Sequence, residues 1–258
     1  MVGIESLKGK NIGYLAHPKN FLDERAVLVM IHGAGGAAEN WLLQLGPLER
    51  YANALALELP GHGKTPGKGY STVEEYANWV IQVLSSTFTD NEELILMGHS
   101  MGGAIVQEVA LREPELLKGI VLVCTGARLK VAPFILQGLE KEFAKTINLI
   151  VSFAYSKDTD PKIISQGAKL MEEAGQEVLI NDFLACDRFD STDRLSQLRL
   201  PSLIISGTND KLTPLELSHE LHELIPSSKL RSVPKAAHMP MVENPLVFNQ
   251  ILAQDVTW

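Results

Sequence analysis

The stretch Leu94-Ile95-Leu96-Met97-Gly98-His99-Ser100-Met101-Gly102 joins an apolar run to a segment with helical periodicity. A short apolar run bounded by a glycine turn is typical of a buried strand in a parallel sheet. A Gly-x-Ser-x-Gly sequence between a strand and a helix is the setting of a nucleophile elbow, in which a strained turn exposes the serine hydroxyl. The helix that follows directs backbone N–H groups at this position. The sequence therefore predicts that Ser100 is a catalytic nucleophile, with ordinary turn chemistry as the alternative.

A serine hydroxyl is a poor nucleophile until a base takes its proton, so a histidine is needed. Downstream of Ser100, His219 and His222 lie in a segment with the apolar periodicity of a helix, which favours exposed helical side chains. A zinc site formed by these two histidines is not supported, because the sequence marks no third ligand near them. His238 instead follows the strand-like run 230–233, where a loop at the carboxyl edge of a parallel sheet can meet Ser100. We predict that His238 is the base; the alternative is a hydrogen-bonded loop histidine.

The acid that orients this histidine is predicted by the same geometry. Residues 201–206 resemble a buried parallel strand, and Asp210 stands in the loop that follows it. No strand precedes the rival carboxylates Asp187, Asp190 and Asp193. We predict that Asp210 is the acid, and a turn or N-cap aspartate is the alternative.

A second glycine-rich loop indicates donors for an oxyanion. The apolar run 27–31 leads into His32-Gly33-Ala34-Gly35-Gly36, where a backbone N–H can turn toward the nucleophile. We predict that the N–H groups of Ala34 and Met101 form the oxyanion hole. A phosphate-binding turn is the weaker interpretation because the loop lacks both the G-x-G-x-x-G spacing and a G-K-[ST] ending.

Short apolar runs alternate with helical patterns along the chain, which predicts a doubly wound, mostly parallel α/β sheet flanked by helices. The predicted strands are 12–16, 26–31, 54–58, 94–97, 119–123, 203–206 and 229–233. The predicted helices are 38–51, 72–86, 101–112, 214–224 and 245–254.

This alternation stops in residues 127–192, where only helical periodicity is found. We predict that 1–126 and 193–258 form one core, and that 127–192 is a helical insertion that does not fold independently. Most of its apolar face should pack onto the core. The remainder should line a hydrophobic pocket over Ser100. The predicted pocket residues are Gly33, Phe134, Leu139, Phe143 and Phe183.

Composition narrows the possible partners. The 258 residues fit one α/β domain. A formal net charge of −8 argues against nucleic acid or an anionic membrane as a partner. Two cysteines, Cys124 and Cys186, do not make a disulfide framework. We find neither a signal peptide nor an apolar run long enough to span a membrane, so we expect a cytoplasmic protein.

Five motifs together resemble the α/β-hydrolase superfamily, and specifically its carboxylesterase-like members with a helical cap. They are 32–36, 59–65, 98–103, 207–210 and 237–238, and the resemblance covers nearly the whole chain. It implies an eight-stranded, mostly parallel sheet, with the cap inserted before the strand that carries the acid. Glu58 departs from the family, whose members usually carry an Asp before the Pro-Gly-His-Gly turn. That turn shapes the sheet edge, so the departure leaves the catalytic prediction intact.

The resemblance implies a serine hydrolase that cleaves carboxylic esters of short to medium acyl chain through an acyl-enzyme. The substrate would be a small neutral ester, and we expect no cofactor and no metal. Monoacylglycerol lipase, lactonase, carbon–carbon bond hydrolase and cofactor-free haloperoxidase chemistry use the same residues and stay open. So does a ligand-binding receptor with a vestigial hydrolase site. Whether the chain is a monomer or a homodimer is open as well.

Overall fold

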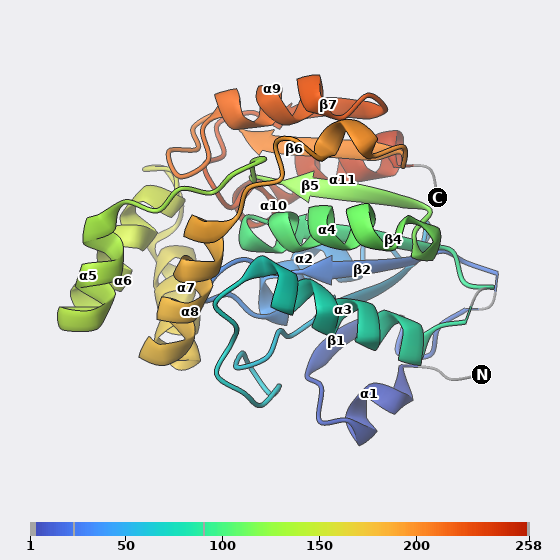
Figure 1. The fold of residues 1–258 in the computed structure, drawn as a ribbon, viewed down its shortest axis with the longest axis horizontal. Coiled ribbons are helices and arrows are strands. Elements are labelled where there is room, and N and C mark those ends of the chain that lie inside the picture. Colours follow the sequence, from blue (N-terminus) through green and yellow to red (C-terminus); the bar gives the residue numbers. More distant parts are fainter. Residues whose placement is uncertain (1–3, 23, 90, 257–258) are drawn as a thin grey trace.

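The computed structural model describes residues 4–22, 24–89 and 91–256. The strands of this part form one sheet in the order β1-β3-β2-β4-β5-β6-β7, with β1 antiparallel to β3 and every other neighbouring pair parallel (Figure 1). The strands are β1 (Tyr14–His17), β2 (Val27–Ile31), β3 (Asn53–Leu57), β4 (Leu94–His99), β5 (Gly119–Val123), β6 (Ser202–Gly207) and β7 (Ser228–Val233).

The predicted α/β architecture is confirmed, with one difference in strand number. The described residues form seven strands rather than eight. The segment before β1 forms helix α1 (Glu5–Gly9), which buries Leu7 completely. Because this segment is helical, it supplies no further strand before β1.

The central strands are apolar along their whole length because both faces of the sheet are covered. Successive side chains of a strand point to opposite faces. Val27, Val29 and Ile31 of β2 therefore pack into one hydrophobic cluster, and Leu28 and Met30 pack into another. Helices α1, α3 (Val73–Thr87), α4 (Met101–Arg112) and α9 (Leu215–Leu224) contribute to the first cluster, and α2 (Leu42–Leu45), α10 (Pro240–Glu243) and α11 (Pro245–Asp255) contribute to the second.

The helices of the core are bounded as follows. They are α2 (Leu42–Leu45), α3 (Val73–Thr87), α4 (Met101–Arg112), α9 (Leu215–Leu224), α10 (Pro240–Glu243) and α11 (Pro245–Asp255), with short 3-10 helices η1 (Ala38–Trp41), η2 (Pro114–Leu116) and η3 (Leu195–Gln197). One prediction is wrong in extent: the single helix expected over 38–51 is a 3-10 turn followed by one short helix. Pro47, two residues after the end of α2, cannot donate a backbone hydrogen bond, so the helix does not continue.

Four helices, which together span residues 133–188, lie between β5 and β6 within the helical insertion 127–192. They are α5 (Pro133–Lys141), α6 (Phe143–Ala154), α7 (Pro161–Ala174) and α8 (Gln176–Arg188). Figure 1 places them beyond the carboxyl ends of the parallel strands, where β4, β5 and β6 terminate. The insertion has its own small hydrophobic cluster and also contacts α3 and α4 of the core through α8. In the part of the chain that the structure describes, no helix is long and apolar enough to cross a membrane.

Candidate active site

Ser100 occupies the turn between β4 and α4 in a strained conformation. Its φ of 54° and ψ of −117° lie outside the regions that L residues usually adopt. The glycines on both sides make the turn possible. A Cβ on Gly98 would lie 2.1 Å from the carbonyl oxygen of Gly102, and a Cβ on Gly102 would lie 2.5 Å from that of Ile31. Ser100 is therefore held at the carboxyl edge of the sheet by close backbone packing that only glycine permits.

His238 and Asp210 meet at the same edge, in the loops that follow β7 and β6. His238 Nδ1 lies 2.8 Å from Asp210 Oδ2. An ionised carboxylate only accepts hydrogen bonds, so Nδ1 carries the proton. The other ring nitrogen, Nε2, is then the basic one in the neutral imidazole. His238 and Ser100 both line one pocket, which brings the predicted base and the predicted nucleophile to the same cavity.

Asp210 is held as an anion. Its Oδ1 accepts the N–H groups of Leu212 and Thr213 at 2.8 and 3.0 Å, and its Oδ2 accepts the Thr213 hydroxyl at 2.6 Å in addition to His238. Burial alone would raise the pKa of Asp210. The charge and hydrogen bond of His238, together with the hydrogen bonds of Thr213, outweigh burial and hold this pKa below its usual range.

The backbone of His238 is fixed from two sides. His99 Nε2 lies 2.8 Å from the His238 carbonyl oxygen, and the N–H of His238 donates to the carbonyl of Ala154 at the end of α6. Burial lowers the pKa of His99 to about 3, so its ring is neutral and donates through Nε2. The helical insertion thus contacts the backbone of the predicted base directly.

The loop of the predicted oxyanion hole runs beside Ser100. A Cβ on Gly33 would lie 3.1 Å from Ser100 Cβ, and the N–H of Gly36 closes a turn onto the carbonyl of Gly33 at 3.0 Å. Ala34 lies within this turn and borders the pocket. Met101 begins α4, where first-turn N–H groups have no partner within the helix. Both predicted donors are therefore on elements that adjoin Ser100.

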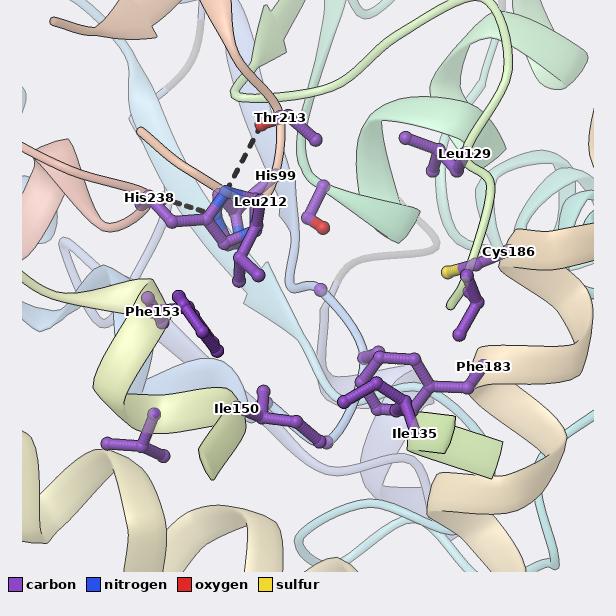
Figure 2. Close-up of a pocket in the computed structure, with 18 of the residues that line it drawn as sticks. His99, Leu129, Ile135, Ile150, Phe153, Phe183, Cys186, Leu212, Thr213 and His238 are labelled. Atoms are coloured by element: carbon purple, nitrogen blue, oxygen red, sulfur yellow. Dashed lines mark hydrogen bonds between the residues drawn. The ribbon is translucent and has the colours of Figure 1, made fainter. Parts of the chain in front are cut away.

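A cavity of about 490 Å³ lies between this edge and the helical insertion (Figure 2). Of the predicted pocket residues, Gly33, Phe134 and Phe183 line it, whereas Leu139 and Phe143 do not. Leu139 is fully buried in the hydrophobic cluster of the insertion, and Phe143 packs against that cluster. The prediction is therefore wrong for these two positions. Helical periodicity shows that a face is apolar, but it does not show which neighbouring element that face contacts. The labelled apolar lining in Figure 2 consists of Leu129, Ile135, Ile150, Phe153, Phe183 and Leu212.

Several residues near the site carry no sequence pattern that would have identified them. Thr213 touches Asp210 and lies 3.2 Å from His238 Nδ1. Glu243 accepts the N–H of Ala237 at 2.7 Å and the N–H of Ser156 at 2.6 Å, which joins the His238 loop to the segment after α6. Asp182 on α8 is fully buried among core residues. The contacts of Thr213 with His238 and of Glu243 with Ser156 join segments that are 25 and 87 residues apart, so they leave no local signal in the sequence.

The remaining candidates lie away from the site. His219 and His222 are exposed on α9, as predicted. Asp190 and Asp193 are exposed and do not line the pocket. The side chain of Asp187 accepts the N–H of Val131 at 3.1 Å, which ties together the two ends of the helical insertion.

Cys124, Asp210 and His238 present three ligand atoms within 4.8 Å of one another. Metal binding would require a thiolate. Burial raises the pKa of the Cys124 thiol well above its ordinary value, which keeps the sulfur protonated. The oxygens of Asp210 are already occupied by hydrogen bonds. The arrangement therefore favours a hydrogen-bonded cluster over a metal centre.

The sequence profile of the Alpha/beta hydrolase family matches residues 28–251, and the chain belongs to this family. Among curated proteins, the chain is 25% identical over 238 residues to the pimeloyl-[acyl-carrier protein] methyl ester esterase of Pectobacterium carotovorum, covering 86% of this chain and 91% of that one. The protein of the same name from Salmonella paratyphi A is 27% identical over 240 residues, covering 87% and 91%.

Solved structures show the same likeness. A thermophilic esterase superposes with a TM-score of 0.79 and is 34% identical, covering 94% of this chain and 96% of that one. The enol-lactonase of Burkholderia xenovorans LB400 superposes with a TM-score of 0.85 at 19% identity, covering 94% and 95%. At that identity the lactonase supports the fold alone.

Proposed function

We propose that this protein is a serine hydrolase that cleaves small, neutral carboxylic esters of short to medium acyl chain through an acyl-enzyme. The observation that carries the proposal is the strained Ser100 turn, which shares a pocket with His238, whose Nδ1 is hydrogen-bonded to Asp210. The esterase relatives support the same chemistry. The pocket wall is largely apolar. Three basic residues border it: Arg128 and Lys130 are engaged by Glu220 and the Asp187 carbonyl, and Lys211 is exposed. The support for a neutral substrate is therefore the apolar wall, which favours uncharged groups.

In the first half-reaction, Ser100 Oγ attacks the ester carbonyl while His238 Nε2 takes the hydroxyl proton. Asp210 stabilises the imidazolium, and the N–H groups of Ala34 and Met101 stabilise the tetrahedral oxyanion. The carbon–oxygen bond to the alcohol then breaks, and the alcohol leaves with the proton from His238. In the second half, water attacks the acyl-enzyme with the same base, which releases the acid and regenerates Ser100.

The test is a Ser100→Ala variant assayed on p-nitrophenyl butyrate and with a fluorophosphonate probe. We expect kcat to fall about a million-fold, because nucleophile and base act as one unit. The probe should label wild type at Ser100 and should not label the variant. The matched control is Ser206→Ala, a buried serine on β6 that does not line the pocket, which should keep both labelling and turnover.

Two outcomes would contradict the proposal. Labelling at a serine other than Ser100 would show that Ser100 is not the nucleophile. A single covalent event with no steady release of p-nitrophenol would indicate a ligand-binding receptor with a vestigial site, in place of an enzyme.

A further inference from the structure

Asp182 is the most completely buried carboxylate near the pocket, and the mechanism above does not use it. It lies on α8 of the helical insertion, yet every hydrogen bond its side chain makes is to a core segment. Oδ2 accepts the N–H of Gly35 at 2.8 Å and faces His62 Nε2 at 2.9 Å, and Oδ1 accepts the Tyr76 hydroxyl at 2.5 Å. Three separate parts of the core therefore converge on one carboxylate.

The partners of His62 determine its charge. Nε2 faces Asp182 Oδ2, and Nδ1 lies 3.1 Å from the carbonyl oxygen of Pro60. Both of these oxygens only accept hydrogen bonds, so both ring nitrogens carry protons and the ring is an imidazolium. Burial would lower the pKa of His62, but the charge and hydrogen bond of Asp182 outweigh it and raise this pKa. His62 and Asp182 are thus a buried ion pair, each with a side chain that is 0% exposed.

In contrast to the charged His62, the adjacent His32 is neutral. Its Nδ1 donates to the carbonyl of Gly33 at 2.8 Å, and its Nε2 accepts the N–H of Leu59 at 3.1 Å. Burial lowers its pKa to about 3. The ring centroids of His32 and His62 are 4.7 Å apart. Of these two neighbouring rings, only that of His62 is positively charged.

The contact with Gly35 links this ion pair to the oxyanion loop. Gly35 has a φ of 62°, and a Cβ there would lie 3.0 Å from Leu179 Cδ1 of α8. The loop is thus pressed against the insertion. Because the N–H of Gly35 is bound to Asp182, the peptide that follows Ala34 has a fixed plane. The Ala34 N–H belongs to the preceding peptide, which is joined to this one at the Cα of Ala34, so a fixed Gly35 N–H limits how far the Ala34 N–H can turn.

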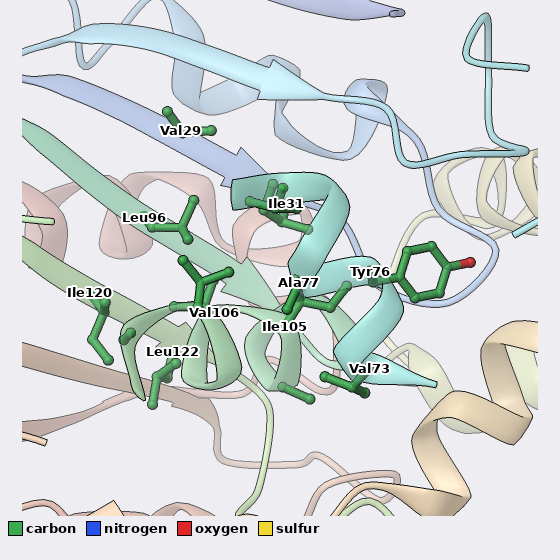
Figure 3. Close-up of a cluster of buried hydrophobic side chains, with 14 of the residues drawn as sticks. Val29, Ile31, Val73, Tyr76, Ala77, Leu96, Ile105, Val106, Ile120 and Leu122 are labelled. Atoms are coloured by element: carbon green, nitrogen blue, oxygen red, sulfur yellow. The ribbon is translucent and has the colours of Figure 1, made fainter. Parts of the chain in front are cut away.

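We propose that Asp182 is a positioning residue for the oxyanion hole. Through Asp182, the helical insertion holds the oxyanion loop in the orientation that catalysis requires. Asp182 occupies the N–H of Gly35 and leaves that of Ala34 for the substrate oxyanion. His62 neutralises the carboxylate, so no unpaired negative charge lies beside an oxyanion that is forming. The inference rests on the proposed function, because it assigns a role within that reaction. In Figure 3 the ring of Tyr76 projects out of the hydrophobic cluster, which leaves its hydroxyl free to reach Asp182.

The test is Asp182→Asn, which keeps the shape of the side chain and removes its charge. We expect kcat to fall about ten- to a hundred-fold, less than for complete loss of an oxyanion donor, with KM changed by less than about threefold. The matched control is Asn181→Ala. Asn181 is the preceding residue of α8 and also joins the insertion to the core, through the carbonyl of Lys68 at 2.9 Å, but it does not touch the oxyanion loop. This control should leave kcat within about twofold.

A pair of inhibitors separates positioning from a purely structural role. A trifluoromethyl ketone forms a serine adduct with an oxyanion, whereas the matched methyl ketone occupies the same cavity without that charge. Asp182→Asn should weaken binding of the first by the same factor as kcat and leave the second unchanged. Equal weakening of both ketones, or equal effects of Asp182→Asn and Asn181→Ala, would overturn the inference.

Tyr76→Phe tests the inference even if Asp182→Asn does not fold. It removes one hydrogen bond to Oδ1 and keeps the charge, so kcat and trifluoromethyl ketone affinity should both fall about threefold. No change in either would overturn the positioning role. Absence of turnover and of adduct in wild type would instead contradict the proposed function.

Discussion

At the scale of single residues, hydrogen-bond geometry determines which nitrogen of each histidine in this site carries a proton. Asp210 receives four hydrogen bonds, and two of them come from backbone N–H groups on Oδ1. This arrangement fixes the orientation of the carboxylate and presents Oδ2 to His238. The neutral His99 then holds the carbonyl of His238. The basic nitrogen of His238 is therefore set by the loop after β6 as much as by the histidine itself.

Asp210→Asn should lower kcat by about ten-thousand-fold at neutral pH. The amide oxygen of the asparagine will stay with the N–H groups of Leu212 and Thr213, so its NH₂ group will face His238 Nδ1. An NH₂ donor there forces the ring proton onto Nε2, the nitrogen that accepts the proton of Ser100 in the proposed reaction. The measurement is kcat on p-nitrophenyl butyrate, with circular dichroism to check the fold.

The controls for this prediction are Asp187→Asn, Asp190→Asn and Asp193→Asn. None of these side chains contacts His238 in the structure, and we expect each variant to keep most of its activity. If one of them proves as damaging as Asp210→Asn without loss of folding, Asp210 is not the acid.

Reasoning from sequence predicts the position of a side chain that follows a strand, whereas the catalytic roles stay predictions. Ser100, Asp210 and His238 come after β4, β6 and β7, and parallel strands carry such positions to one edge. It missed Asp182 and Thr213. Asp182 lies 120 residues from His62 and 147 from Gly35, and it sits on a helix whose pattern marks only an apolar face. A long-range contact of this kind leaves no local signal.

At the scale of elements, the sheet was predictable and the helical insertion was predictable only as helices. Runs such as 94–97 are apolar throughout because both faces of the strand are covered. In the insertion, the same apolar periodicity serves two different environments. Leu139 faces its hydrophobic cluster and Phe183 faces the pocket, although the sequence marks both as apolar positions of a helix.

The pocket of the insertion should limit acyl-chain length. Each methylene buried in the cavity gains about 0.8 kcal/mol, and a methylene beyond it gains little or must overfill the space. We therefore expect kcat/KM on p-nitrophenyl esters to peak at short to medium chains. Phe183→Ala should move the peak to longer chains, because Phe183 lines the cavity. Phe143→Ala, on the same insertion but away from the cavity, should leave the peak where it is.

The ester panel should run from two to sixteen carbons, above and below the solubility limit of each ester. We expect no increase in rate when the substrate forms an emulsion. A rate that rises through sixteen carbons, or that jumps at the solubility limit, would assign this protein to the lipases.

At the scale of the whole molecule, buried histidines dominate the response to pH. Four of the seven histidines are buried: His32, His62, His99 and His238. His32 and His99 are neutral, and burial lowers the pKa of each to about 3. His62 is charged, and its pKa is raised. The sequence shows seven histidines but not their surroundings, so the opposite shifts of His32 and His62 could not be predicted from it.

These shifts predict that stability is greatest near neutral pH. When the protein unfolds below pH 6.5, His32 and His99 each bind a proton that they exclude when folded, so their contribution is full above pH 6.5 and is lost as pH falls toward 3. Two protons correspond to about 3 kcal/mol of unfolding free energy per pH unit. His62 has the opposite sign: its contribution is full below pH 6.5 and is lost as pH rises through its raised pKa. Asp210, with its lowered pKa, adds a loss only at more acidic pH, below about 4.

Urea unfolding followed by circular dichroism at pH 7, 6 and 5 measures this slope directly. His99→Gln removes one of the two titrating groups, and its side-chain NH₂ can still donate to the carbonyl of His238, so the slope between pH 6 and 5 should halve. His222→Gln is the matched control because His222 is exposed on α9, and its slope should equal that of wild type. A free energy of unfolding that stays constant from pH 7 to 5 would show that the buried rings of His32 and His99 accept protons in the folded state. That result would contradict the neutral state assigned to both rings from their burial and hydrogen bonds.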